Sequence, residues 1–370
     1  MKNKLLIFGT STPRSGGSLV SNMLSSHRDI IITKDLIHFF RHIFNKYKPI
    51  EKDKNKYLLV EELCLRILIR NRIKLSPKII IKKIQYSKNY DEIIREISNY
   101  LLSKLKKKKI VGETANTEWR NIEIFLKLNK NNKSFQVIRD PRAILSSWKK
   151  LTYAKGYKYL NILFAWIDAI NFSEKNLKNF KSRFIRIKFE DVHKNPKKIA
   201  KNLCKFFGVH FDMNMVRQKK WPKLLKNKLN FINVSSYTNK ETFGFSNERT
   251  LRWRESIEEW ELALVQHLFK KQLKKLKYKI YNVDKSLIGK ALKILKSDKL
   301  LWKNYKYFIR TGKGSDKRLN DPSKPENWGA VDYSKDIKAK FIDSNEYKIF
   351  KRRMLIIKKK SKNFDYKSYR

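Results

Sequence analysis

The feature that most constrains the fold is an apolar run near the start of the chain, Leu5–Phe8, which ends at Gly9. Such a run is typical of a strand buried on both faces of a parallel sheet. A loop of Gly, Ser, Thr and Pro follows, and apolar residues then recur at helical spacing from Leu19 to Leu24. The order of strand, short loop and helix predicts one unit of an α/β fold.

Further strand and helix patterns alternate along the chain. The expected strands are Ile30–Ile32, Ile110–Gly112, Phe135–Ile138 and Arg183–Phe189. Helical patterns separate them, and one of these, at about 39–108, is a lysine-rich stretch that we interpret as a helical insertion. Strands that alternate with helices predict a P-loop-like, doubly wound parallel sheet.

The composition changes after about Asn282, where Lys and Tyr become more frequent. We therefore expect an α/β domain over 1–282. Residues 283–370 are expected to form a basic, lysine-rich C-terminal extension or a small accessory lobe.

The chain carries a large positive charge, with 87 Lys and Arg against 34 Asp and Glu in 370 residues, a net charge of +53. The excess is spread along the whole chain, and Lys, Ile and Asn are all abundant, as A/T-rich coding sequence would produce. A positive field of this size also attracts anionic substrates. A hydrophobic fraction of 41% supplies enough apolar surface for a full core, which excludes a wholly disordered chain.

Two cysteines, Cys64 and Cys204, are too few for a disulfide framework or a zinc site, which fits a reducing compartment. No segment reaches the roughly 18 apolar residues that a transmembrane helix needs. We expect a cytoplasmic protein without a metal.

The first motif is the loop Thr12–Ser18, which joins the first strand to its helix. Small residues let backbone N–H groups approach an anion, the helix N-terminus adds a positive dipole, and Arg14 adds a charge. Such a loop binds phosphate or sulfate, although a simple Gly/Ser turn would look the same. The Gly-Lys-Ser/Thr ending of nucleoside-triphosphate loops is missing, which argues against ATP chemistry.

The second motif is Arg139–Ser147, at the end of a predicted buried strand, where open α/β sheets bind ligands. Arg139 and the Ser147 hydroxyl, eight residues later, can together hold a second phosphate. The alternative is structural, with Asp140 capping the helix that begins at Pro141.

Together the two motifs resemble the sulfotransferase family that uses 3′-phosphoadenosine 5′-phosphosulfate (PAPS). Two later stretches are also similar: Phe184–Val192, with the following Pro196 and Phe206–Val209, and the segment from Ser235 to Arg254. The resemblance spans roughly residues 4–280 and includes features of the glycan and tyrosyl-protein branches. It implies that PAPS is the co-substrate, held by Arg14, Ser15, Gly16, Gly17, Ser18, Arg139, Ser147, Ser235, Arg249 and Arg252.

The same resemblance implies metal-free transfer of a sulfuryl group to a hydroxyl acceptor, with Arg14 among the catalytic residues. In the related branches a Glu beyond a His-Pro segment removes the acceptor proton. Here Asp35 lies at the matching distance after His27, whereas His38 begins a His-Phe-Phe sequence like that of the glycan branch. We favour Asp35 as the base and keep His38 as the alternative. The His-Phe-Phe likeness indicates a carbohydrate acceptor.

One departure concerns the family sequence Gly-Glu-Lys-Thr-Pro, whose lysine assists the leaving group. This chain has Thr114 in the position of that lysine. Arg14 then acts alone, another lysine reaches the site, or activity is weak.

Two other functions compete with the transferase. A non-catalytic basic protein on this fold would bind nucleic acid or anionic membrane, with an affinity that falls steeply with salt. A nucleotide kinase shares the fold class but lacks its loop ending. We take a small-molecule or glycan acceptor as the expected partner.

Overall fold

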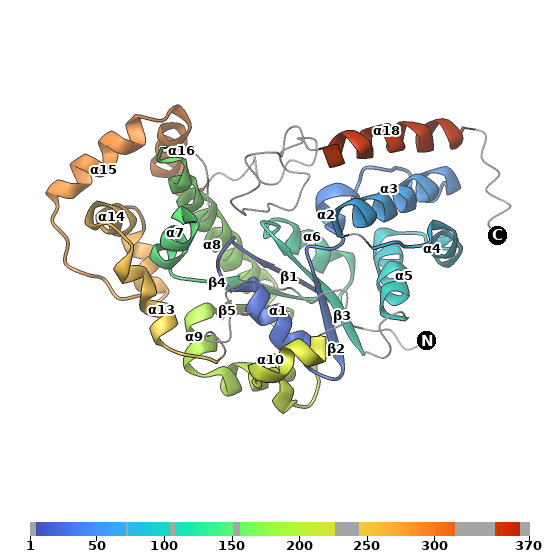
Figure 1. Ribbon diagram of the computed structural model, residues 1–370, viewed down its shortest axis with the longest axis horizontal. Helices are drawn as coiled ribbons and strands as arrows, with labels where there is room; N and C mark the ends of the chain where they lie inside the picture. The colour runs from blue at the N-terminus through green and yellow to red at the C-terminus, as the bar shows by residue number, and fades with distance from the viewer. Residues whose placement is uncertain are drawn as a thin grey trace.

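The computed structural model describes residues 5–71, 73–103, 109–150, 156–225, 244–314 and 345–362. A parallel sheet with the strand order β2-β3-β1-β4-β5 forms its centre (Figure 1). Its strands are β1 (Leu5–Ser11), β2 (Ile30–Lys34), β3 (Ile110–Asn116), β4 (Lys133–Ile138) and β5 (Phe184–Lys188). The expected α/β class with a doubly wound parallel sheet is confirmed.

Helices surround this sheet. The α-helices of the described residues are α1 (Gly17–Ser25), α2 (Phe39–His42), α3 (Asp53–Asn71), α4 (Pro77–Ile84), α5 (Tyr90–Ser103), α6 (Asn121–Leu128), α7 (Pro141–Lys149), α8 (Asn161–Asn179), α9 (Phe189–Lys194), α10 (Pro196–Phe207), α11 (Trp221–Leu225), α13 (Glu248–Leu251), α14 (Glu259–Lys275), α15 (Ser286–Lys296), α16 (Lys299–Thr311) and α18 (Asn345–Lys360). Short 3₁₀ helices are η1 (Lys158–Leu160), η2 (Met213–Met215), η3 (Gln218–Lys220) and η5 (Arg252–Glu255).

Alternate residues of β1 enter different cores, because successive side chains of a strand point to opposite faces of the sheet. Leu6 and Phe8 pack with apolar residues of α3, α4, α5 and α6. Ile7 packs on the other face with apolar residues of α1 and α10, including Leu19. Both faces are therefore covered, which explains why the strands read as continuous apolar runs.

The helices α2 to α5 lie between β2 and β3, where the sequence predicts the helical insertion. The buried residues of α5 include Ile93, Ile97 and Leu101, which are spaced four apart and so share one helix face. This face packs in the core that includes Leu6 and Phe8 of β1.

The C-terminal helices are attached in two places. α15 and α16 pack with α8 and α14 in a third core that contains Trp166, Phe269 and Phe308. α18 lies beside α3 (Figure 1), where Phe350 and Met354 are buried in a small apolar cluster. The expected division at residue 282 stays a prediction. In the part of the chain that the structure describes, no helix is both long and apolar enough to cross a membrane.

Candidate functional site

The candidate site lies at the carboxyl edge of the sheet. Arg14 follows β1, Asp35 follows β2 and Arg139 follows β4. Parallel strands end at the same edge, so three residues that are far apart in the sequence come to one region. This is the edge at which open α/β sheets bind ligands.

Two glycines of the loop before α1 stand where a side chain would meet a close neighbour, and one of them also has a left-handed backbone. Gly16 has φ +88°, and a Cβ there would lie 2.3 Å from Cδ2 of Phe189. A Cβ on Gly17 would lie 2.5 Å from Oγ of Ser11. The loop is therefore packed closely against the sheet and α9, and the free N–H groups of the first turn of α1 lie at its end.

The two anion-binding motifs are in direct contact. Nε of Arg14 donates to Oγ of Ser147 over 2.9 Å, and Nη1 of Arg139 donates to the backbone carbonyl of Arg14, also over 2.9 Å. The loop after β1, Arg139 directly after β4 and Ser147 of α7 thus form one cationic site.

Arg139 is held from two sides. Its guanidinium lies over the ring of Phe189, 4.3 Å from the ring centroid. Its backbone carbonyl accepts a hydrogen bond from Nε1 of Trp166 over 3.0 Å. Phe189 is also the side chain that faces Gly16, so it connects the glycine loop to Arg139.

The other residues expected to hold the nucleotide lie around this contact. The hydroxyl of Ser15 is bonded to that of Thr12, and the hydroxyl of Ser18 accepts from Lys34. Arg249 and Arg139 both act on His193: burial, together with these two positive charges, lowers the pKa of His193 to about 4. Arg252 is exposed on η5, and Ser235 lies outside the described residues.

Asp140 is the N-cap of α7, as in the structural alternative given above. It caps α7 by accepting from the backbone N–H of Arg142 at 2.9 Å, and it forms an ion pair of 2.6 Å with the guanidinium of Arg142. Arg142 in turn packs on the ring of Trp253, 4.7 Å from its centroid. The segment that contains Arg249 is thereby fixed beside α7.

Asp35 and His38, the two candidate bases, lie side by side. Oδ1 of Asp35 is 3.4 Å from Nε2 of His38. Both Asp35 oxygens accept hydrogen bonds from Asn116, one from its backbone N–H at 2.9 Å and one from its side-chain amide at 3.0 Å. Nδ1 of His38 is 2.6 Å from Oε1 of the fully buried Glu118. Because a carboxylate only accepts, Nδ1 carries the hydrogen and Nε2 faces Asp35.

Non-glycine residues with left-handed backbone are concentrated here. Arg14 has φ +65°, Asp35 and His38 each have φ +48°, and Thr117 has φ +63°. L-residues avoid this region because Cβ approaches the backbone. Strain of this kind clusters at functional sites, where the surrounding structure holds it in place.

A model of the sulfotransferase family matches residues 7–213, more than half of the chain. The chain belongs to the sulfotransferase family. Its fold is similar to that of the sulfotransferase domain of the Synechococcus PCC 7002 olefin synthase, with a TM-score of 0.51 and 17% identity over 76% of this chain and 98% of that one. The sulfotransferase domain from the curacin biosynthetic pathway has a TM-score of 0.49 and 15% identity over 75% and 99% of the two chains. The search of curated proteins gives no match.

Thr114, the departure from the family sequence considered above, is fully buried. Its hydroxyl accepts from Oγ of Ser21 on α1 over 2.9 Å. It therefore contributes to the packing of β3 against α1 and supplies no charge.

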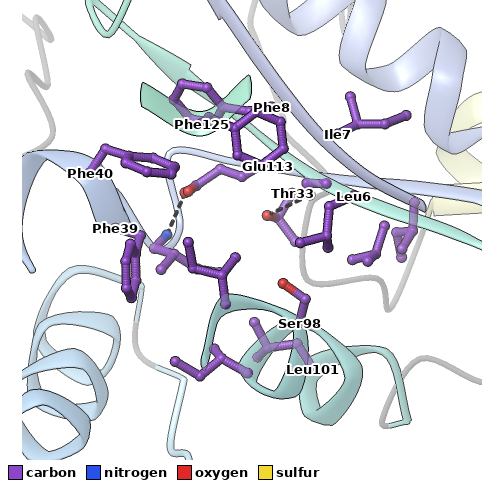
Figure 2. Close-up of a pocket in the computed structure, with 16 residues that line it drawn as sticks. Leu6, Ile7, Phe8, Thr33, Phe39, Phe40, Ser98, Leu101, Glu113 and Phe125 are labelled. Atoms are coloured by element: carbon purple, nitrogen blue, oxygen red, sulfur yellow. Dashed lines mark hydrogen bonds between the residues drawn. The ribbon is translucent and has the colours of Figure 1, made fainter. Parts of the chain in front are cut away.

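An apolar cavity lies beneath the loop of this sulfotransferase that carries Asp35 and His38. Figure 2 shows Phe8, Phe39, Phe40, Phe125 and Glu113 among its lining residues. Oε1 of Glu113 accepts from the backbone N–H groups of Ile37 and His38, at 2.5 and 2.9 Å. Burial, with the nearby Glu118 carboxylate, raises the pKa of Glu113 to about 8. Phe39 and Phe40 are buried in the core, so their role is packing.

The sequence did not single out three side chains that complete the site: Lys34, Asn116 and Glu118. Lys34 and Asn116 are the last residues of β2 and β3, and Glu118 follows two residues later. Their position at strand ends was a usable signal, because the strands themselves could be predicted.

Proposed function

We propose that the protein transfers a sulfuryl group from PAPS to a hydroxyl acceptor. The observation that carries the proposal is the contact of the two anion-binding motifs through Arg14, Ser147 and Arg139. PAPS has an anionic group on each side of its ribose, so it needs two neighbouring cationic sites. Two motifs on separate faces of the protein could not bind the same nucleotide.

The donor fits what surrounds this contact. Because Gly16 and Gly17 have no Cβ, the backbone N–H groups of the loop can approach an anion. The positive end of the α1 dipole lies at the same N-terminus. We assign the 5′-phosphosulfate to this loop and to Arg14, Ser15 and Ser18. The 3′-phosphate is assigned to Arg139 and Ser147, with Arg249 nearby.

For the acceptor we propose Asp35 as the base. Its side chain is 24% exposed, whereas that of His38 is 3% exposed, so Asp35 is the group that an acceptor can reach. The acceptor oxygen forms a bond to sulfur and loses its proton to Asp35. The bond between sulfur and the 5′-phosphate oxygen breaks, and the nucleotide leaves with the electron pair. The two hydrogen bonds from Asn116 position the Asp35 carboxylate, and His38, fixed by Glu118, lies beside it.

A carbohydrate hydroxyl remains the proposed acceptor, on the strength of the His-Phe-Phe likeness. The site leaves a carboxylate facing solvent beside a helical insertion, which suits a polar acceptor. Sulfation of a panel of glycans and small alcohols, followed with radiolabelled PAPS, would identify the class.

Calorimetric titration with the product nucleotide, 3′-phosphoadenosine 5′-phosphate (PAP), tests the donor site. A hydrogen bond to a charged group is worth about 1.5–3 kcal/mol, so Arg14→Ala and Arg139→Ala should each weaken binding about 10- to 150-fold. Arg310→Ala, on an exposed position of α16, is the matched control and should bind normally.

Unchanged affinity in both site variants would contradict the assignment. If the protein ignored PAP but bound DNA or anionic vesicles with steep salt dependence, the non-catalytic basic protein would be the better description.

A further inference from the structure

Lys34 is a lysine in an unusual place. It ends β2 next to Asp35, its side chain is only 14% exposed, and its Nζ donates a hydrogen bond to Oγ of Ser18 in the first turn of α1. Nζ lies 3.9 Å from Oδ2 of Asp35. A buried ammonium normally has a close ion pair that compensates for lost hydration, and here the carboxylate is near but not in tight contact.

The charges around Lys34 do not fully compensate its ammonium group for burial. Burial lowers its pKa, the Asp35 carboxylate raises it, and the Arg14 guanidinium lowers it further. Lys34 at the end of β2 and Arg14 in the loop after β1 thus place two cations near the N-terminus of α1. An anion at the N-terminus of α1 would be attracted to both and would restore the favourable surroundings that Lys34 lacks.

Lys34 also supplies a cation close to Thr114, the position at which the family sequence has a lysine. In the parallel register of the sheet, Lys34 on β2 is the partner of Thr114 on β3. Thr114 is bonded to Ser21 of α1, and Lys34 is bonded to Ser18, one helical turn closer to the helix N-terminus. The cation therefore reaches the anion loop from the neighbouring strand.

We propose that Lys34 is a catalytic residue that binds the sulfuryl group of the donor and stabilises the charge on the departing phosphate oxygen. This rests on the proposed function. The ammonium lies between the loop that holds the leaving group and Asp35, which receives the acceptor proton. Such a group acts more strongly as negative charge develops during transfer, so it contributes to kcat more than to binding of PAPS.

The test compares Lys34→Met with the wild-type protein in two measurements: PAP release from PAPS in single turnovers with water as the acceptor, and PAP affinity by calorimetry. Loss of one donor to a developing charge typically costs 10²–10³ in rate, so we expect a fall of about that size. PAP affinity should weaken about 10- to 150-fold, because the 5′-phosphate of PAP carries the charge that Lys34 stabilises, so rates are compared at saturating PAPS. Lys34→Arg should keep the rate within about tenfold of wild type, since it retains the charge.

Lys133→Met is the matched control. Lys133 is the first residue of β4, so it lies at the amino end of the strand, away from the site. Its Nζ donates to the carbonyl of Phe206, and its loss should leave PAP release unchanged. A rate for Lys34→Met within about threefold of wild type, with PAP still bound, would overturn the role of Lys34 alone. A Lys34→Arg rate as low as that of Lys34→Met would overturn it too. Wild-type protein that neither binds PAP nor releases it from PAPS would overturn the proposed function as well.

Discussion

The substitution Gly16→Ala tests how the glycine loop is built. Gly16 has φ +88°, and a left-handed conformation costs an L-residue about 1–2 kcal/mol. The new methyl group would also lie 2.3 Å from Cδ2 of Phe189, which real contacts do not allow. Phe189 is buried against the loop and Arg139, so it must move or the loop must open, and overpacking of this kind costs about 1–3 kcal/mol. We expect a total loss of about 2–5 kcal/mol in the free energy of unfolding.

Gly208→Ala separates the two contributions. Gly208 has φ +74° at the end of α10, and a Cβ there would meet nothing within 4 Å. It therefore reports the backbone cost alone, about 1–2 kcal/mol. Both variants gain the same small benefit from a stiffer unfolded chain, which cancels in the comparison.

Urea denaturation of the three proteins, followed by circular dichroism, measures the difference. Gly16→Ala should be the less stable variant by the overpacking cost and should also bind PAP more weakly, because Phe189 supports Arg139. Equal losses in the two variants would refute the reasoning about Phe189.

The remaining predictions concern the base, a buried acid and a support. Asp35→Asn should lower turnover with the identified acceptor by about 10²–10⁴ while PAP affinity stays within about threefold, and normal turnover would exclude Asp35 as the base. The folded protein holds a proton on Glu113 that the unfolded chain, with a pKa near 4.5, releases. The free energy of unfolding should therefore fall from pH 5 to pH 8, and Glu113→Gln should lessen that fall; equal slopes in urea titrations would contradict this. Trp166→Phe removes the hydrogen bond to the Arg139 carbonyl and leaves a cavity in the third core, so it should cost about 2–4 kcal/mol in the same assay.

The strands were predictable because a buried parallel strand leaves a continuous apolar run. Leu5–Phe8 and Phe135–Ile138 both lie inside observed strands. The same reading placed Arg14 and Arg139 after strands that end at one edge, and the structure adds that Arg14 contacts Ser147 directly. Local pattern and parallel topology were enough for these features.

The catalytic surroundings were harder, because they depend on contacts across the sheet. Asp35 and His38 appeared as alternatives in the sequence, whereas the structure places their side chains next to each other. Glu118 orients His38 across 80 positions of sequence, and no spacing rule links the two. Lys34 was hidden among many lysines, and only its burial and its bond to Ser18 distinguish it.

The left-handed backbone of Arg14, Asp35 and His38 has a consequence for engineering. Each position forgoes roughly 1–3 kcal/mol that glycine would recover. The hydrogen bonds of these side chains, such as that of His38 to the buried Glu118, offset the strain, so a change that relieves it also removes the chemical groups of the site. A thermostable version of this chain has to be selected on turnover and melting temperature together.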